Sequence, residues 1–195
     1  MQNPAPSTDH FFKVACCFEA ALTLVAIFLG WLTHIDPFAN LIFSESAFFQ
    51  GLALTLPLLL FFFALQELPY TPLKKIRELL LETLGSRLYK RHWTDLLILA
   101  VIAGFSEEVL FRGFLQPWLE GIGGLTIGLV FSNLIFALVH AVTPLYALLA
   151  LLMGLYLGIS LDYGPERNLL LPILIHTFYD FIAFLVILRN YRNSL

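Results

Sequence analysis

The sequence predicts an all-α membrane protein, a bundle of about six transmembrane helices plus one amphipathic interfacial helix. Of the 195 residues, 59% are hydrophobic and only 13% are charged, whereas a soluble domain carries roughly a quarter charged residues. The apolar residues gather in runs of about 20 residues, the length at which a helix crosses a bilayer. We expect one transmembrane domain over residues 1–195.

Turn-forming residues separate the apolar runs and set the bounds of the predicted spans. The first run is longer than the apolar stretch of a secretory signal peptide, and Lys13 is the only basic residue before it. We therefore expect this run to persist as a helix of the mature protein. The predicted spans are residues 14–33, 47–66, 95–118, 122–141, 144–161 and 168–187.

Residues 72–93, between the second and third predicted spans, form an amphipathic pattern that predicts a helix lying on the membrane surface. Cytoplasmic loops are enriched in Lys and Arg. Placing residues 68–94 in the cytoplasm brings both termini to the same side and leaves Arg167 alone in an outer loop. We expect an integral protein of a bacterial inner membrane with both termini cytoplasmic.

Several other classes of protein do not fit the sequence. No basic cluster of the kind that binds nucleic acid is present, so we expect no nucleic-acid partner. Cys16 and Cys17 are adjacent in an apolar run, which excludes a disulfide framework. We expect membrane lipid as the surrounding partner and no cofactor, and the pattern leaves the oligomeric state open.

Glu107, Glu108 and Arg112 stand in the otherwise apolar span 95–118, where uncompensated charges would be very costly. Glu108 and Arg112 are four residues apart and project within about 40° of each other on a helix. We expect them to form a bidentate ion pair. Glu107 points about 140° away from Arg112, which makes its carboxylate a candidate general base.

Two further polar patterns lie in later spans. Phe136 and His140 are four residues apart at the end of span 122–141, and His176 and Asp180 have the same spacing in span 168–187. Alone, each His is more often a packing residue than a catalytic one, and each pattern could be polar contact between helices. Three such patterns on three helices instead predict one shared polar pocket, with a base, a water-orienting group and hydrogen-bond donors for an oxyanion.

Together, in this order, the motifs resemble those of the CPBP family, the CAAX-protease and bacteriocin-processing intramembrane glutamic endopeptidases. The resemblance covers about residues 95–188, which we expect to be the catalytic core. Each motif alone is weak, and three in order within membrane helices are specific. The motifs are Glu107-Glu108-x-x-x-Arg112, Phe136-x-x-x-His140 and His176-x-x-x-Asp180.

The resemblance implies an intramembrane endopeptidase in which Glu107 activates the hydrolytic water and His140 helps to hold it. It also implies that His176, with the residue four positions later, stabilises the oxyanion. Many relatives have Asn at that position, and an ionised Asp180 cannot donate a hydrogen bond, so Asp180 is expected to orient His176 or to stay protonated. The supporting residues would be Glu108, Arg112 and Phe136.

Alternatives remain open at this level. A zinc-dependent version of the same hydrolysis is disfavoured, because no His-Glu-x-x-His pattern is present and Arg112 would repel a cation near Glu108. A non-catalytic scaffold or proton-coupled carrier could use the same polar cluster. The substrate could be a prenylated tail, a peptide precursor or another membrane protein. Glu107 lies about 18 Å along the helix from Asp95, at the start of its span, whereas His140 is near the cytoplasmic face. The two residues would therefore differ in depth. We expect a deep cavity open to the cytosol to bring them together.

Overall fold

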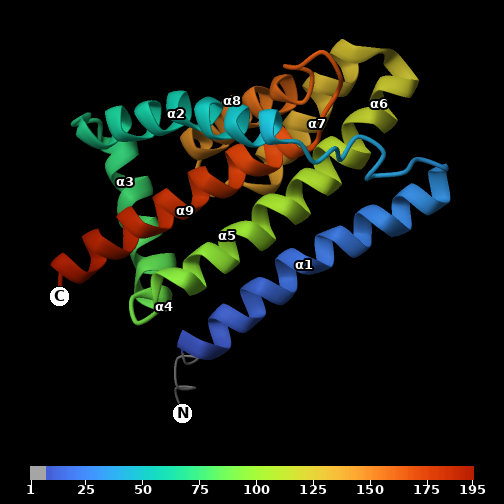
Figure 1. Ribbon diagram of the computed structural model, residues 1–195. Coiled ribbons are helices and arrows are strands. Elements are labelled where there is room, and N and C mark those ends of the chain that lie inside the picture. Colours follow the sequence, from blue (N-terminus) through green and yellow to red (C-terminus); the bar gives the residue numbers. More distant parts are fainter. Residues whose placement is uncertain (1–7) are drawn as a thin grey trace.

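The computed structural model describes residues 8–195, and every regular element in this range is helical (Figure 1). The all-α prediction is confirmed. The elements are α1 (Thr8–Thr33), α2 (Glu45–Glu67), α3 (Thr71–Leu80), the π-helical segment η1 (Leu81–Gly85), α4 (Ser86–Leu88), α5 (Trp93–Glu108), the π-helical segment η2 (Val109–Leu115), α6 (Gln116–Gly123), α7 (Leu125–Val139), α8 (Pro144–Ser160) and α9 (Leu170–Asn193).

Three helices within residues 8–195, α1, α2 and α9, are long and apolar enough to cross a membrane. They coincide with the first, second and last predicted spans. The fourth and fifth predicted spans correspond to α7 and α8, which are apolar but shorter. The third corresponds to α5, which continues through η2 into α6 without a break from Trp93 to Gly123.

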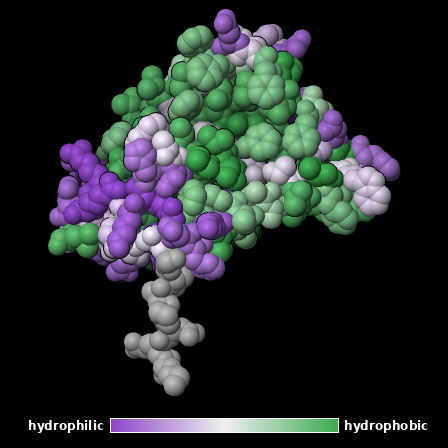
Figure 2. Space-filling model, turned by 60° about the horizontal axis from the view of Figure 1, so that its bottom comes forward, coloured by the Kyte–Doolittle hydropathy of each residue, from purple (hydrophilic) through white to green (hydrophobic). Residues whose placement is uncertain are grey.

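The surface of the bundle is unusually apolar. Large hydrophobic side chains such as Phe18, Trp31 and Leu60 are 65%, 72% and 70% exposed, and a soluble monomer rarely leaves such side chains together in water. Figure 2 shows hydrophobic residues over most of one face, with the largest group of hydrophilic residues at one end and smaller groups at the other edges. The protein is therefore an integral membrane protein, with its apolar surface in lipid.

Helix α9 packs against α5 on one side and α2 on the other, and α1 lies along α5 (Figure 1). The contact between α5 and α9 is close at Gly104, where an added Cβ would lie 2.5 Å from Oγ1 of Thr177. Phe12 on α1 joins the cluster built on Leu96, near the start of α5, whereas Ala26 joins the cluster that contains Val109. Helices α1 and α5 therefore run parallel.

The predicted amphipathic segment is helical over α3, η1 and α4, with Leu73 and Ile76 buried. Arg77 donates hydrogen bonds to the carbonyl groups of Leu65, Gln66 and Leu68, so it caps the C-terminal end of α2. The helical turns stop at Leu88 rather than at the predicted Trp93. This boundary was wrong because Arg192 of α9 binds the next backbone carbonyls, those of Tyr89 and Arg91, at 2.8 and 3.0 Å.

At the opposite end of the bundle, Arg167 joins the α8–α9 connection to α6. Its guanidinium donates to both carboxylate oxygens of Asp162, at 2.7 and 2.8 Å, and to both of Glu120, at 2.6 and 3.1 Å. The hydrogen bonds to Asp162 and Glu120 raise the pKa of Arg167 above its already high usual value. The guanidinium therefore stays charged throughout the accessible pH range.

We expect Arg167→Ala to lower the free energy of unfolding by about 1 to 3 kcal/mol, because it removes charge-assisted hydrogen bonds and leaves Glu120 without this cation. Denaturation of the purified protein in detergent micelles measures this loss. Glu166→Ala is the matched control, since Glu166 is an exposed neighbour. An Arg167→Ala variant as stable as the control would show that the ion pairs contribute nothing measurable.

Candidate active site

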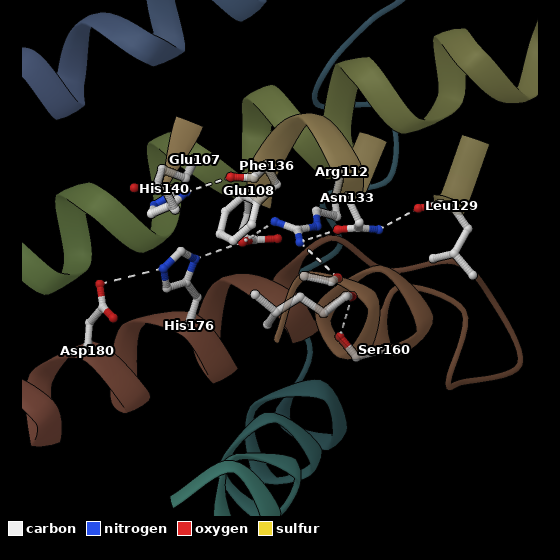
Figure 3. A network of polar contacts seen from close by, with 12 residues as sticks. Glu107, Glu108, Arg112, Leu129, Asn133, Phe136, His140, Ser160, His176 and Asp180 are labelled. Carbon is white, nitrogen blue, oxygen red and sulfur yellow. Dashed lines mark hydrogen bonds and ion pairs between the residues drawn. The ribbon is translucent and has the colours of Figure 1, made fainter. Parts of the chain in front are cut away.

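The first polar motif lies where α5 passes into η2. Glu107 and Glu108 are the last two residues of α5, and both are buried. The wider π-helical turns begin at Val109, and such turns inside α-helices occur often at functional sites. The two adjacent carboxylates diverge from this point, and Figure 3 shows them directed toward different partners.

Glu108 and Arg112 form a buried ion pair, as the spacing predicts. Nη1 of Arg112 donates to Oε1 of Glu108 at 2.8 Å, and both side chains are 0% exposed. The bidentate geometry was wrong: Nη2 of Arg112 instead donates to Oδ1 of Asn133 at 2.7 Å and to the carbonyl of Gly154 at 2.9 Å. Arg112 therefore ties η2 to both α7 and α8.

Glu108 also holds the histidine of the third motif. Its Oε1 lies 2.7 Å from Nδ1 of His176 on α9, and it is the same oxygen that accepts from Arg112. Because an ionised carboxylate only accepts, Nδ1 of His176 carries the proton of this hydrogen bond. On the other side of the ring, Nε2 lies 3.5 Å from Oδ2 of Asp180. The ring of His176 is thus fixed between two carboxylates (Figure 3).

His140 follows the last turn of α7 and approaches Glu107. Its Nδ1 lies 2.8 Å from the carbonyl oxygen of Phe136, which only accepts, so Nδ1 is the protonated nitrogen. Nε2 then faces Oε2 of Glu107 at 3.6 Å. The difference in depth anticipated from the sequence does not occur, because α7 has 15 residues and a length of only about 22 Å. The C-terminal end of α7 therefore meets α5 near Glu107 and not near the first turn of α5.

Phe136 packs among the polar groups rather than in a separate core. Its ring centroid lies 4.3 Å from that of His140 and 6.3 Å from that of His176, and the Arg112 guanidinium lies 4.7 Å from the ring. A cation over an aromatic face is attracted by its quadrupole. Phe136 therefore supports both histidines and Arg112 at once.

The sequence-predicted site residues Glu107, His140, His176 and Asp180 all line one cavity of about 650 Å³, here called the site cavity. Glu108 and Arg112 do not line it but contact two of its lining residues, His176 and Phe136. Most of the remaining lining is apolar. It comes from α1, α2, α3, α5, α8 and α9, for example from Phe18, Phe61, Leu73, Leu99, Met153 and Phe184.

Sequence reasoning missed two groups of this site. Asn133, fully buried, is the side-chain partner of Arg112 on α7. It precedes Phe136 by three residues and His140 by seven, so the helical period would have placed it on the same face. Glu19 of α1 also lines the site cavity; as an isolated carboxylate near the end of an apolar run, it gave no local signal. Among residues 8–195, no group of three or more His, Cys, Asp or Glu side chains could hold a metal ion.

A helical bundle with an apolar surface and an internal cavity that carries these carboxylates and histidines has the features of an intramembrane protease. Residues 89–182 match the family model "Rce1-like", described as type II CAAX prenyl endopeptidase Rce1-like. These residues therefore form a domain of the Rce1-like type II CAAX prenyl endopeptidase family, a family of proteases. The predicted resemblance is confirmed. The match begins and ends six residues before the expected range of residues 95–188. No curated protein and no solved structure matches the chain.

Proposed function

We propose that the protein is an endopeptidase that hydrolyses a peptide bond inside its membrane bundle with a water molecule activated by Glu107. The observation that carries this proposal is the pairing of Glu107 with His140. Oε2 of Glu107 and Nε2 of His140 lie 3.6 Å apart on the wall of the site cavity. Oε2 of Glu107 is buried without a hydrogen-bond partner among the described residues, so it is free to accept a proton from water.

In the proposed reaction the water oxygen attacks the peptide carbonyl carbon while Glu107 takes one water proton. Neutral His140, protonated at Nδ1, can accept the second hydrogen of that water at Nε2 and so fix its position. When the carbon–nitrogen bond breaks, Glu107 returns its proton to the leaving amine. One water is consumed, one carboxyl and one amine form, and the site ends in its starting protonation state.

His176 is the proposed donor to the oxyanion of the tetrahedral intermediate. Glu108 holds Nδ1 of His176, and Asp180 lies 3.5 Å from Nε2 at the edge of the site cavity. A His176 ring protonated between these carboxylates presents an N–H at Nε2 beside the reacting carbonyl. Asp180 then acts by orienting and charging this ring rather than by donating itself.

The apolar lining of the site cavity indicates the kind of substrate. Apolar side chains from α1, α2, α3 and α8 make up much of its lining, whereas the proposed catalytic residues stand on α5, on α9 and after α7. Such a lining stabilises an apolar segment attached to the peptide, at roughly 25 cal/mol for each Å² removed from water. We propose a membrane-associated substrate. It is a prenylated tail, a peptide precursor or another membrane protein.

We also propose six membrane crossings, with both termini in the cytoplasm. Basic residues support this orientation, because those that are exposed gather at the end of the bundle where α1 and α5 begin and where α2 and α9 finish (Figure 1). These residues are Lys13, Lys74, Lys75, Lys90, Arg189 and Arg192. The short α7 and α8 would cross with their ends below the membrane surface. A bacterial inner membrane is the proposed location.

The test is cleavage of matched peptides by purified protein, with products identified by mass spectrometry. We expect a prenylated peptide to be cleaved with a KM at least about tenfold lower than the same peptide without the lipid, because the lipid gains burial. Equal KM values for the two peptides would show that the apolar lining does not contribute to substrate recognition. Loss of cleavage with a chelator and recovery with zinc would establish the metal-dependent alternative, and peptide binding without cleavage would establish the scaffold.

A further inference from the structure

Glu19 is a third carboxylate of the site cavity, beside Glu107 and Asp180, and comes from outside the segment that matches the protease family. It stands on α1, whereas the family match covers residues 89–182. Glu19 lines the same cavity as Glu107. Its Oε2 is buried without a hydrogen-bond partner among the described residues. A buried carboxylate in a membrane helix requires a partner or a function.

The register of α1 against α5 brings Glu19 to Glu107. Phe12 and Cys16 pack with Leu96 and Leu99 in one cluster, and Ala26 packs with Val109 in another. Glu19 lies between these contacts on the same face of α1, because residues three, four and seven apart share a helix face. Since the two helices run parallel, this position is level with the segment of α5 that ends at Glu107.

Both carboxyl groups line the site cavity, and they lie near enough to act on each other. A hydrogen bond between two carboxyl groups requires one proton on the pair, because two ionised carboxylates only accept. Two like charges in contact also repel strongly away from water, so the pair retains one proton. Glu107 additionally faces Nε2 of His140, whereas no ion-pairing group faces Glu19 in this way among residues 8–195.

We propose that Glu19 is a positioning residue that keeps this proton and donates it as a hydrogen bond to Glu107, holding Glu107 ionised and aimed at the water. This role rests on the proposed hydrolysis by Glu107. Glu19 does not exchange its proton during the reaction. It orients the base, as the hydrogen-bonded neighbour of a catalytic group commonly does.

Several charged and titratable groups surround the pair and set the background of any pH profile. Arg87 and Arg91 lie over the rings of Phe11 and Phe12, at the start of α1. The groups that line the same cavity are Arg77 on α3, His140 after α7, Tyr146 and Tyr156 on α8, and His176, Tyr179 and Asp180 on α9; Glu108 and Arg112 lie behind it. All of them are unchanged in a Glu19 variant, so a difference from wild type reports on Glu19.

The experiment compares Glu19→Ala and Glu19→Gln in the peptide-cleavage assay, with Glu67→Gln as control at an exposed position of α2. We expect Glu19→Ala to lower kcat/KM by about 10- to 100-fold, the effect of a hydrogen bond to a charged group. The Gln amide donates permanently, so Glu19→Gln should recover activity to within about tenfold of wild type. In wild type, activity should fall at alkaline pH as the shared proton is removed. In Glu19→Gln this fall should be smaller.

Infrared spectroscopy gives a second measurement that does not depend on turnover, or on the folding of the Ala variant. Wild-type protein at neutral pH should show the carbonyl stretch of a protonated carboxylic acid, and Glu19→Gln should lack it. The inference is overturned if Glu19→Ala has the rate and pH profile of wild type, if Glu19→Gln is as impaired as Glu19→Ala, or if the stretch persists in Glu19→Gln. An active Glu107→Gln variant would instead refute the proposed function.

Discussion

Replacing Glu107 by Gln is expected to lower kcat for peptide hydrolysis by about 100- to 10,000-fold, the contribution of a positioned general base. The amide has nearly the same shape as the carboxylate but cannot take a proton from water. Because the substitution leaves the apolar side chains of the site cavity unchanged, KM for a lipid-modified peptide should stay close to the wild-type value. The measurement is initial rate against peptide concentration in detergent or liposomes.

The same substitution should leave the fold intact and even stabilise it. The Glu107 side chain is 10% exposed, and its Oε2 has no hydrogen-bond partner among the described residues. A neutral amide costs less to bury than this carboxylate, so the melting temperature should be equal to or higher than that of wild type. Glu67→Gln controls for the loss of one surface charge. Unimpaired cleavage by a folded Glu107→Gln variant would remove Glu107 as the base.

Much of the candidate site could be predicted from the sequence because its pairs are local. Glu108 with Arg112, and His176 with Asp180, are each four residues apart, and helix geometry alone places both members of each pair on one face. The contact of Glu108 with His176 joins residues 68 positions apart. No spacing rule predicts such a contact, which depends on how α9 packs against α5.

The incorrect details have the same origin. The bidentate ion pair was expected because sequence spacing offers Arg112 no partner other than Glu108. The folded bundle supplies Asn133 and Gly154, and an added Cβ at Gly154 would lie 2.7 Å from Oδ1 of Asn133. Glu19 likewise became part of the site only through the register of α1 against α5. Local pattern predicts which face a residue occupies, and packing decides what that face meets.

Helix type was similarly easier to predict than helix extent. Composition and apolar runs were sufficient for an all-helical membrane protein, since hydrocarbon requires backbone groups to bond within their own segment. The lengths of α7 and α8 depended on where turns fall, and the π-helical turns of η2 have no sequence signature. These departures from regular spans bring His140 to the level of Glu107.

Arg112→Ala is expected to be the most destabilising single change in the site, with a loss of about 3 to 5 kcal/mol in the free energy of unfolding. The substitution leaves Glu108, 0% exposed, with His176 as its remaining partner among the described residues, and leaves Oδ1 of Asn133 and the carbonyl of Gly154 without their donor. It also removes the cation that packs over the ring of Phe136. Denaturation in mixed micelles measures the loss.

Arg112→Lys separates the charge from the geometry of the guanidinium. A lysine keeps the positive charge beside Glu108, but its single ammonium group cannot reproduce the planar fork that reaches three acceptors on three elements. We therefore expect Arg112→Lys to recover part of the stability lost in Arg112→Ala. If the two variants were equally unstable, the geometry of the contacts to Asn133 and Gly154 would contribute more to stability than the charge. If Arg112→Ala were as stable as wild type, the buried ion pair would not stabilise the bundle. Because Oε1 of Glu108 also binds His176, a displaced Glu108 should lower cleavage even in variants that remain folded.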